Sequence, residues 1–135
     1  EHVWREKALG RDEYDVGVQN DLEAYVGEAH GRYRRPIVCQ LYDAPLDLFD
    51  RHLYEKGGLV LHLLRTELGD ALFWKGVGTY LKRHQKGVVE TRDLISDLRD
   101  ATETAGDLAA WVQVLAGPSP TTPPAYVAIG AERRA

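Results

Sequence analysis

The sequence contains no methionine and only one cysteine, Cys39, so it has neither an internal disulfide nor a cysteine cluster for a metal. A single cysteine fits a reducing compartment, and we expect a cytoplasmic protein. No apolar run approaches the ~18 residues of a membrane span, and no stretch has the pattern of a signal peptide. Because the chain begins Glu1-His2-Val3, we expect a piece of a longer protein or a processed product.

Basic residues are also scarce relative to acidic ones. The 17 Lys and Arg are outnumbered by 21 Asp and Glu, which gives a net charge of -4. Without a Lys/Arg face, the chain is not expected to bind nucleic acid or a membrane surface. The one basic cluster, Arg32-Tyr33-Arg34-Arg35, precedes Pro36 and indicates either a solvated loop or a salt-bridging corner.

Several catalytic and metal-binding motifs are missing as well. The five histidines show no i, i+4 pair and no His-Glu-x-x-His, so the chain alone is not expected to bind zinc or another cofactor; they are His2, His30, His52, His62 and His84. A phosphate-binding glycine loop, a Gly-x-Ser-x-Gly turn and a Cys/His pair are absent too. We expect His62, on the solvent side of its helix, and His84 to be structural or solvated.

What the sequence does contain is a series of amphipathic segments separated by Gly and Asp. This pattern predicts an all-α array of four to five helices with short connections. The expected helical ranges are 1–9, 12–31, 54–68, 70–84 and 91–101, with a last short stretch at 108–115. Asp12 and Asp70 are the expected N-caps of their helices. Residues 36–41 are expected to be extended, and 117–135, rich in proline, to form a loose tail after a 1–116 domain.

The segment from residue 54 to 68 carries the clearest stripe. Its members recur every three or four residues, as on one buried face of a helix: Tyr54, Gly57, Leu61, Leu64 and Leu68. In the next helix the same spacing predicts buried Phe73, Val77, Tyr80 and Leu81. Gly57 and Gly58 cost ~1 kcal/mol each relative to alanine. Something is therefore expected to approach the helix backbone closely there.

Tyr54 is the candidate catalytic residue. A tyrosine hydroxyl with a pKa of ~10 donates a hydrogen bond at neutral pH, and such a donor stabilises a developing oxyanion. The alternative is a core tyrosine whose hydroxyl reaches water, and the residues alone favour that alternative.

A longer pattern around Tyr54 resembles a known family. Leu48-Phe49-Asp50, Tyr54-Glu55-Lys56-Gly57, Val60 to Arg65 and Leu68-Gly69-Asp70 are similar to the aminopeptidase N-like (gluzincin) zinc metallopeptidases. The similarity continues through Phe73-Trp74, Tyr80-Leu81 and Val89 to Leu94. Upstream, Trp4-Arg5-Glu6 and Gly10 to Tyr14 resemble the sequence that follows the family's third zinc ligand.

The resemblance implies the C-terminal half of a thermolysin-like catalytic domain. In that family a His-Glu-x-x-His helix and a later glutamate hold zinc, and the motif glutamate is the general base. Tyr54 falls on the oxyanion-stabilising tyrosine, whereas Lys56 matches the motif without a catalytic role. The implied substrate is a peptide that loses residues one at a time from its free N-terminus.

The zinc helix and the third ligand have no counterpart in this sequence. We therefore expect the isolated chain to be inactive, to need an N-terminal catalytic segment as its partner, and to self-associate. The alternative is a non-catalytic helical scaffold or partner-binding module derived from the peptidase fold.

Overall fold

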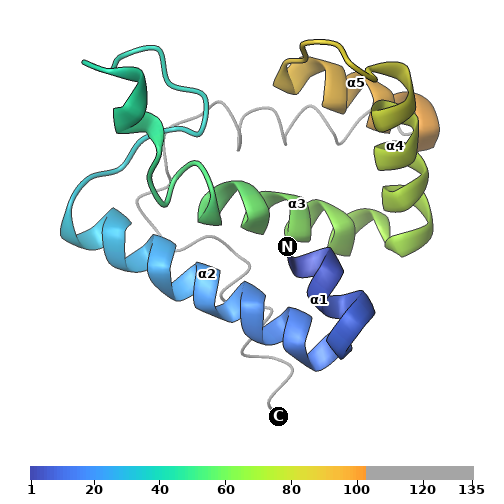
Figure 1. Cartoon of the computed structure of the whole chain (residues 1–135), viewed down its shortest axis with the longest axis horizontal. Helices are drawn as coiled ribbons and strands as arrows, with labels where there is room; N and C mark the ends of the chain where they lie inside the picture. Colours follow the sequence, from blue (N-terminus) through green and yellow to red (C-terminus); the bar gives the residue numbers. More distant parts are fainter. Residues whose placement is uncertain (103–135) are drawn as a thin grey trace.

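The computed structural model describes residues 1–102, which form helices and loops without a strand in that range (Figure 1). This confirms the all-α class. The elements are α1 (His2–Leu9), α2 (Arg11–Gly31), a short 3-10 helix η1 (Pro45–Leu48), α3 (Glu55–Leu68), α4 (Asp70–Arg83) and α5 (Thr91–Thr102). The predicted stretch at 108–115, the tail at 117–135 and the boundary between the two predicted domains lie outside the described residues.

Helix α3 is the central element of the fold. Contacts join α1 to α2, α2 to α3, α3 to α4 and α4 to α5. In Figure 1, α3 runs beside α2 and leads into α4 and α5 at its far end. Two apolar clusters share it: Tyr25 and Ala29 of α2 pack with Leu59, while Leu64 packs with residues of α4 and α5. Each half of α3 is therefore buried by a different neighbour.

The buried face of α3 differs from the predicted stripe. Its buried residues are Lys56, Leu59, Val60, Leu64 and Arg65. Of the predicted stripe only Leu64 is fully buried, and Leu61 is 39% exposed. The prediction was wrong because the run from 59 to 64 is apolar on nearly every side, so spacing alone does not select one face. The positions of α2, α4 and α5 select it instead.

The buried faces of α2 and α5 agree with those that the apolar spacing predicts, which are Val18, Leu22, Tyr25, Val26 and Ala29 in α2 and Leu94, Ile95, Leu98 and Ala101 in α5. Tyr25 and Ala29 are buried in α2, and Ile95, Leu98 and Ala101 are buried in α5. In α4, Phe73 is buried as predicted, but Leu81 is 61% exposed. The reason is Gly76, where an added Cβ would lie 2.5 Å from a Leu98 methyl group. Helix α5 approaches α4 at this glycine and leaves Leu81 uncovered.

Both predicted N-caps were wrong. The observed N-caps are Gly10, two residues before Asp12, and Gly69, one residue before Asp70; both glycines have positive φ, and α2 and α4 begin at Arg11 and Asp70. The Asp70 carboxylate does not cap its helix, because it pairs with Arg65 at 2.6 Å. Residues 36–41 form part of the non-helical connection between α2 and η1.

None of the helices described here combines the length and the apolar character that crossing a bilayer requires.

Candidate functional site at the start of α3

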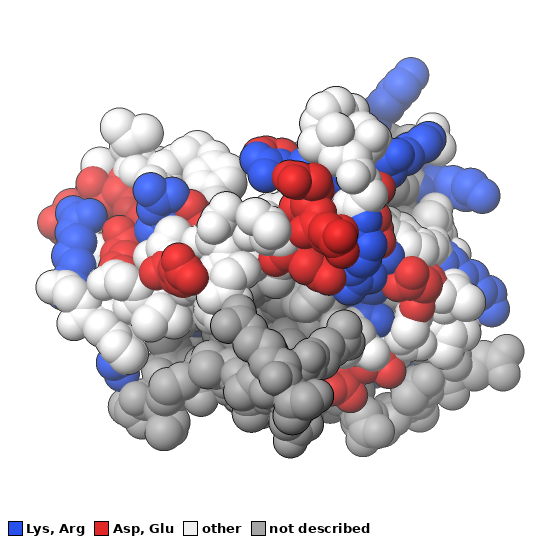
Figure 2. Space-filling model, turned by 90° about the horizontal axis from the view of Figure 1, so that it is seen from below, with Lys and Arg blue, Asp and Glu red and all other residues white. Residues whose placement is uncertain are grey.

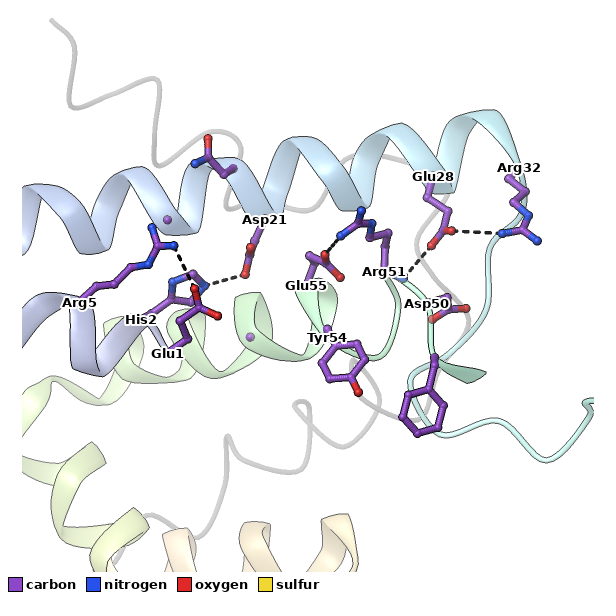
Figure 3. A pocket seen from close by; sticks show the side chains of 14 residues that line it. Glu1, His2, Arg5, Asp21, Glu28, Arg32, Asp50, Arg51, Tyr54 and Glu55 are labelled. Atoms are coloured by element: carbon purple, nitrogen blue, oxygen red, sulfur yellow. Dashed lines mark hydrogen bonds and ion pairs between the residues drawn. The ribbon is translucent and has the colours of Figure 1, made fainter. Parts of the chain in front are cut away.

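Tyr54 lies at the rim of a groove rather than in the core. It is the residue immediately before α3, and its side chain is 59% exposed. The Phe49 ring lies beside it, with the two ring centroids 6.1 Å apart. In Figure 3 the Tyr54 ring points away from α2, with its hydroxyl at the tip. The phenol of Tyr54 is thus accessible to solvent.

The groove has a volume of about 760 Å³ and is bordered by α1, α2 and the segment from 49 to 58 (Figure 3). Five carboxylates line it (Glu1, Asp21, Glu28, Asp50 and Glu55) together with Arg5, Arg32 and Arg51. Many of these groups pair with one another: His2 contacts Asp21 at 2.7 Å, and Arg5 contacts Glu1 at 3.0 Å. The lining is therefore polar and of mixed charge.

The same mixing of charge extends to the molecular surface. On the face shown in Figure 2, blue Lys and Arg side chains border red Asp and Glu side chains instead of forming one continuous basic area.

One of the lining carboxylates, Asp50, belongs to a buried ion pair. The Arg35 guanidinium contacts both oxygens of Asp50, at 2.6 and 2.8 Å, and both side chains are largely buried. The Tyr33 hydroxyl also donates to Asp50. Burial by itself raises the pKa of Asp50, but the hydrogen bonds from Arg35, Tyr33 and the Leu53 amide outweigh it and lower this pKa to about 2. Asp50 is therefore ionised across the physiological range.

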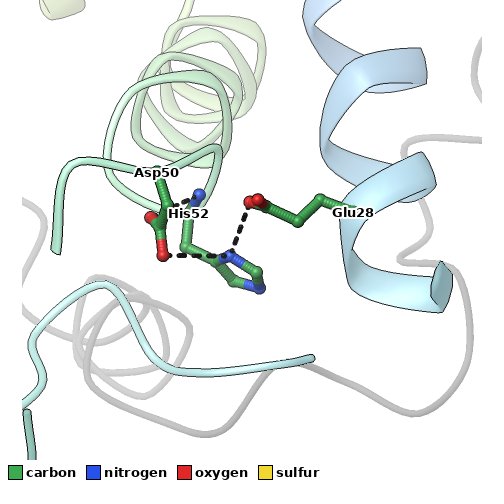
Figure 4. Close-up of side chains that lie close together, drawn as sticks. All are labelled: Glu28, Asp50 and His52. Atoms are coloured by element: carbon green, nitrogen blue, oxygen red, sulfur yellow. Dashed lines mark hydrogen bonds and ion pairs between the residues drawn. The ribbon is translucent and has the colours of Figure 1, made fainter. Parts of the chain in front are cut away.

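His52 is enclosed between the rings of Tyr25 and Tyr33 and the carboxylates of Glu28 and Asp50, of which Figure 4 shows the carboxylates. It is 0% exposed, and its ring stacks on Tyr33 with centroids 5.2 Å apart. Its Nδ1 lies 3.3 Å from Glu28 and 3.7 Å from Asp50. Burial lowers the pKa of His52 despite the neighbouring Asp50, which favours the neutral imidazole.

Comparison with known proteins identifies the family. A family model described as "Peptidase family M1 domain" matches residues 6–114. This chain belongs to peptidase family M1. It is 39% identical over 79 residues to an aminopeptidase N of Streptomyces lividans, a match that covers 56% of this chain and 9% of that protein.

Two other relatives agree with this result. The M1 chain is 32% identical over 99 residues to an aminopeptidase N of Lactococcus lactis, covering 71% of the chain and 11% of the relative. It is 40% identical over 55 residues to aminopeptidase 2 of Candida albicans, a match that covers 41% of this chain and 6% of that protein. The chain thus spans about a tenth or less of the length of these aminopeptidases. No solved structure gives a significant match.

M1 peptidases are in general zinc-dependent. The described residues contain one group of possible metal ligands whose donor atoms lie within 4.8 Å of one another: Glu28, Asp50 and His52. However, Arg35 contacts both Asp50 oxygens, and Glu28 accepts the Arg51 amide at 2.9 Å. A cation here would have to displace a buried guanidinium. This cluster of the M1 chain therefore does not fit zinc.

Two further histidines of the M1 chain have structural contacts. His62 was expected on the solvent side of its helix, but it is half-buried and bonds the Tyr14 hydroxyl at 2.8 Å, joining α3 to α2. His84 bonds Asp97 at 2.9 Å, joining the end of α4 to α5. Both histidines thus connect neighbouring helices.

The residue that sequence reasoning missed is Arg35. Between the two interpretations of the basic cluster, the structure selects the salt-bridging corner: Arg35 pairs with Asp50, and the exposed Arg32 contacts Glu28 at 3.7 Å. The signal in the sequence is weak, because Arg35 and Asp50 lie 15 positions apart and several other acidic residues are equally near. Only the folded chain shows which carboxylate it contacts.

Proposed function

We propose that this chain is part of a zinc-dependent aminopeptidase and that Tyr54 donates the hydrogen bond that stabilises the oxyanion during peptide hydrolysis. The observation that carries the proposal is the exposed phenol of Tyr54 at the rim of a polar groove, inside the region that matches the M1 family. The relatives that support it carry the name aminopeptidase.

The proposal requires Tyr54 only to donate a hydrogen bond. When water attacks a peptide carbonyl, negative charge develops on the carbonyl oxygen, and a donor fixed in advance stabilises that charge. A phenol with a pKa of ~10 remains protonated at pH 7 and donates without transferring its proton. Zinc in the complete enzyme would activate the attacking water. Its ligands and the general base belong, in this proposal, to a segment outside this sequence.

The substrate class follows from the same proposal. An aminopeptidase binds a peptide by its free α-amine and releases the N-terminal residue. We propose that the groove lined by Tyr54 is part of the site in which that peptide lies. The groups that recognise the amine lie, in this proposal, outside this sequence.

Tyr54→Phe in the complete enzyme tests this role. The variant should lower kcat/KM about 10²-fold, as expected for the loss of one oxyanion donor. Zinc content should not change, because Tyr54 is not a ligand in this proposal. Tyr42→Phe is the matched control, since Tyr42 is also an exposed tyrosine but does not line the groove. A Tyr54→Phe enzyme that stays within about threefold of the parent would rule out the oxyanion role.

A reconstitution experiment separates the enzyme from the scaffold alternative. The chain alone should show no peptidase turnover, and joining it to a segment with His-Glu-x-x-His should produce turnover that needs zinc. A gene without such a segment in frame would instead favour the non-catalytic scaffold.

A further inference from the structure

The turn that carries Tyr54 is organised by carboxylates. The Arg51 amide donates a hydrogen bond to the Glu28 carboxylate at 2.9 Å. The amides of His52 and Leu53 each donate to Asp50 Oδ1 at 3.0 Å. The Tyr54 amide donates to the Asp50 carbonyl at 3.3 Å. Three of these four amides therefore depend on a single residue, Asp50.

The position of Asp50 is in turn fixed by Arg35. Beyond its two contacts with Asp50, the Arg35 guanidinium donates to the carbonyl oxygens of Pro36, Ile37 and Leu48 at 2.8 to 3.1 Å. The ion pair thus joins the loop after α2, the end of η1 and the turn before α3. A bidentate, buried guanidinium–carboxylate pair has a narrow range of geometries. It therefore restricts where the turn can lie.

Among the described residues, little else fixes the direction of the Tyr54 side chain. Its side chain is mostly exposed, and its ring contact is with Phe49, which is also exposed. The first residues of a helix have no intrahelical partners for their amides, so the preceding turn decides how the helix begins. The direction of the phenol is thus set by the backbone of the turn rather than by packing around the ring.

We propose that Asp50, clamped by Arg35, is a positioning residue that holds the Tyr54 hydroxyl in its catalytic direction. This inference rests on the proposed function of Tyr54. A displacement of about 1 Å in a catalytic group costs on the order of 10²-fold in rate. Release of the turn should therefore reduce turnover while the groove still binds peptide.

Asp50→Asn in the complete enzyme is the direct test. The amide side chain keeps the shape of the carboxylate but loses the charge that Arg35 contacts. We expect kcat to fall at least tenfold, with KM within about threefold, because the lost interaction acts on the transition state. Tyr33→Phe, which removes one hydroxyl contact to Asp50, should give a smaller loss in the same direction and keeps the test usable if Asp50→Asn does not fold.

Asp97→Asn is the matched control. Asp97 is a buried carboxylate paired with Arg83 and His84, and it does not line the groove. The Asp97→Asn substitution should lower thermal stability without lowering kcat. Equal loss of kcat in the two variants would show that general destabilisation is the cause and would overturn the proposal.

The decisive readout is coupling to Tyr54. In a Tyr54→Phe background, Asp50→Asn should cost less than about threefold further, because the group that it positions is already gone. Full additivity of the two losses would overturn the positioning role. If Tyr54→Phe alone has no effect, the proposed function itself fails. If Tyr54→Phe is damaging but Asp50→Asn is not, only this inference fails.

Discussion

At the scale of single residues, the least expected feature is the buried cation two residues after Tyr54. Lys56 is 3% exposed, and its Nζ donates to the Arg35 carbonyl at 3.3 Å and lies 5.9 Å from the centre of the Tyr25 ring. Burial, followed by the charge of Arg35, lowers the pKa of Lys56 to about 8. The fold therefore favours the neutral amine.

This shift makes a prediction about stability and pH. The folded-state pKa lies below the unfolded value, so the unfolded chain binds more protons between pH 8 and 10, and stability should rise with pH in that window. Below pH 8 the charged amine costs stability. Lys56→Met should raise the free energy of unfolding at pH 7 by about 2 kcal/mol, because the ~3 kcal/mol implied by the shift is partly offset by a lost hydrogen bond.

Urea unfolding of the chain at pH 7 and pH 9.5 provides the measurement. The free energy of unfolding should rise between these two pH values in the parent chain. This rise should disappear in Lys56→Met but persist in Lys75→Met, which changes an exposed position of α4. Equal pH profiles in the parent and Lys56→Met would show that Lys56 is not the titrating group.

At the scale of helices, the glycines differ in how closely a neighbouring element approaches them. An added Cβ at Gly57, near the start of α3, would meet nothing within 4 Å, whereas at Gly58 it would lie 3.5 Å from the Asp21 carboxylate. The sequence-based expectation of a close approach to the backbone is therefore wrong for Gly57, and at Gly58 the contact would be an ordinary van der Waals one. Gly76 of α4 is more crowded, with the Leu98 backbone also 3.3 Å from the added Cβ.

Alanine substitutions should separate these glycines. Gly57→Ala should stabilise the chain by up to about 1 kcal/mol, the difference in helix propensity. Gly76→Ala should destabilise it by about 1–3 kcal/mol, since α5 must move away from α4. The midpoints of chemical denaturation report both changes. A neutral Gly76→Ala would be inconsistent with the contact between Gly76 and Leu98.

At the scale of the whole molecule, α1 stands apart among the described α-helices because it is little buried. It has no fully buried residue, and Trp4 is 66% exposed, with Val3 and Leu9 also exposed. Helix α1 is held largely by polar contacts, including Glu6 to Arg65 at 2.6 Å. Large apolar side chains left open in this way favour association with another surface.

We therefore expect the isolated 15.2 kDa chain to self-associate and to melt below about 60 °C, near the top of the usual range for domains of mesophiles. Trp4→Glu should shift the chain toward the monomer in analytical ultracentrifugation. Leu41→Glu, at a 91% exposed position of the loop before η1, is the control and should change the distribution less. A monomeric parent chain with a cooperative transition well above 60 °C would contradict this expectation.

The sequence by itself determined the helices, the buried faces of α2 and α5, and the candidacy of Tyr54. These features depend on residues within a turn or two of one another, such as the glycines before α2 and α4 and the regular spacing of apolar residues. The resemblance of residues 48–70 to the peptidases is local in the same way.

Only the tertiary structure decided the partner of Arg35, the burial of Lys56 and the outer side of α3. Arg35 and Asp50 are separated by 15 positions, and the partner of an ionic side chain depends on which segments fold against each other. The apolar run in α3 has several possible buried faces, and its neighbours α2, α4 and α5 select one of them. Contacts between distant segments, which local spacing does not encode, fix these choices.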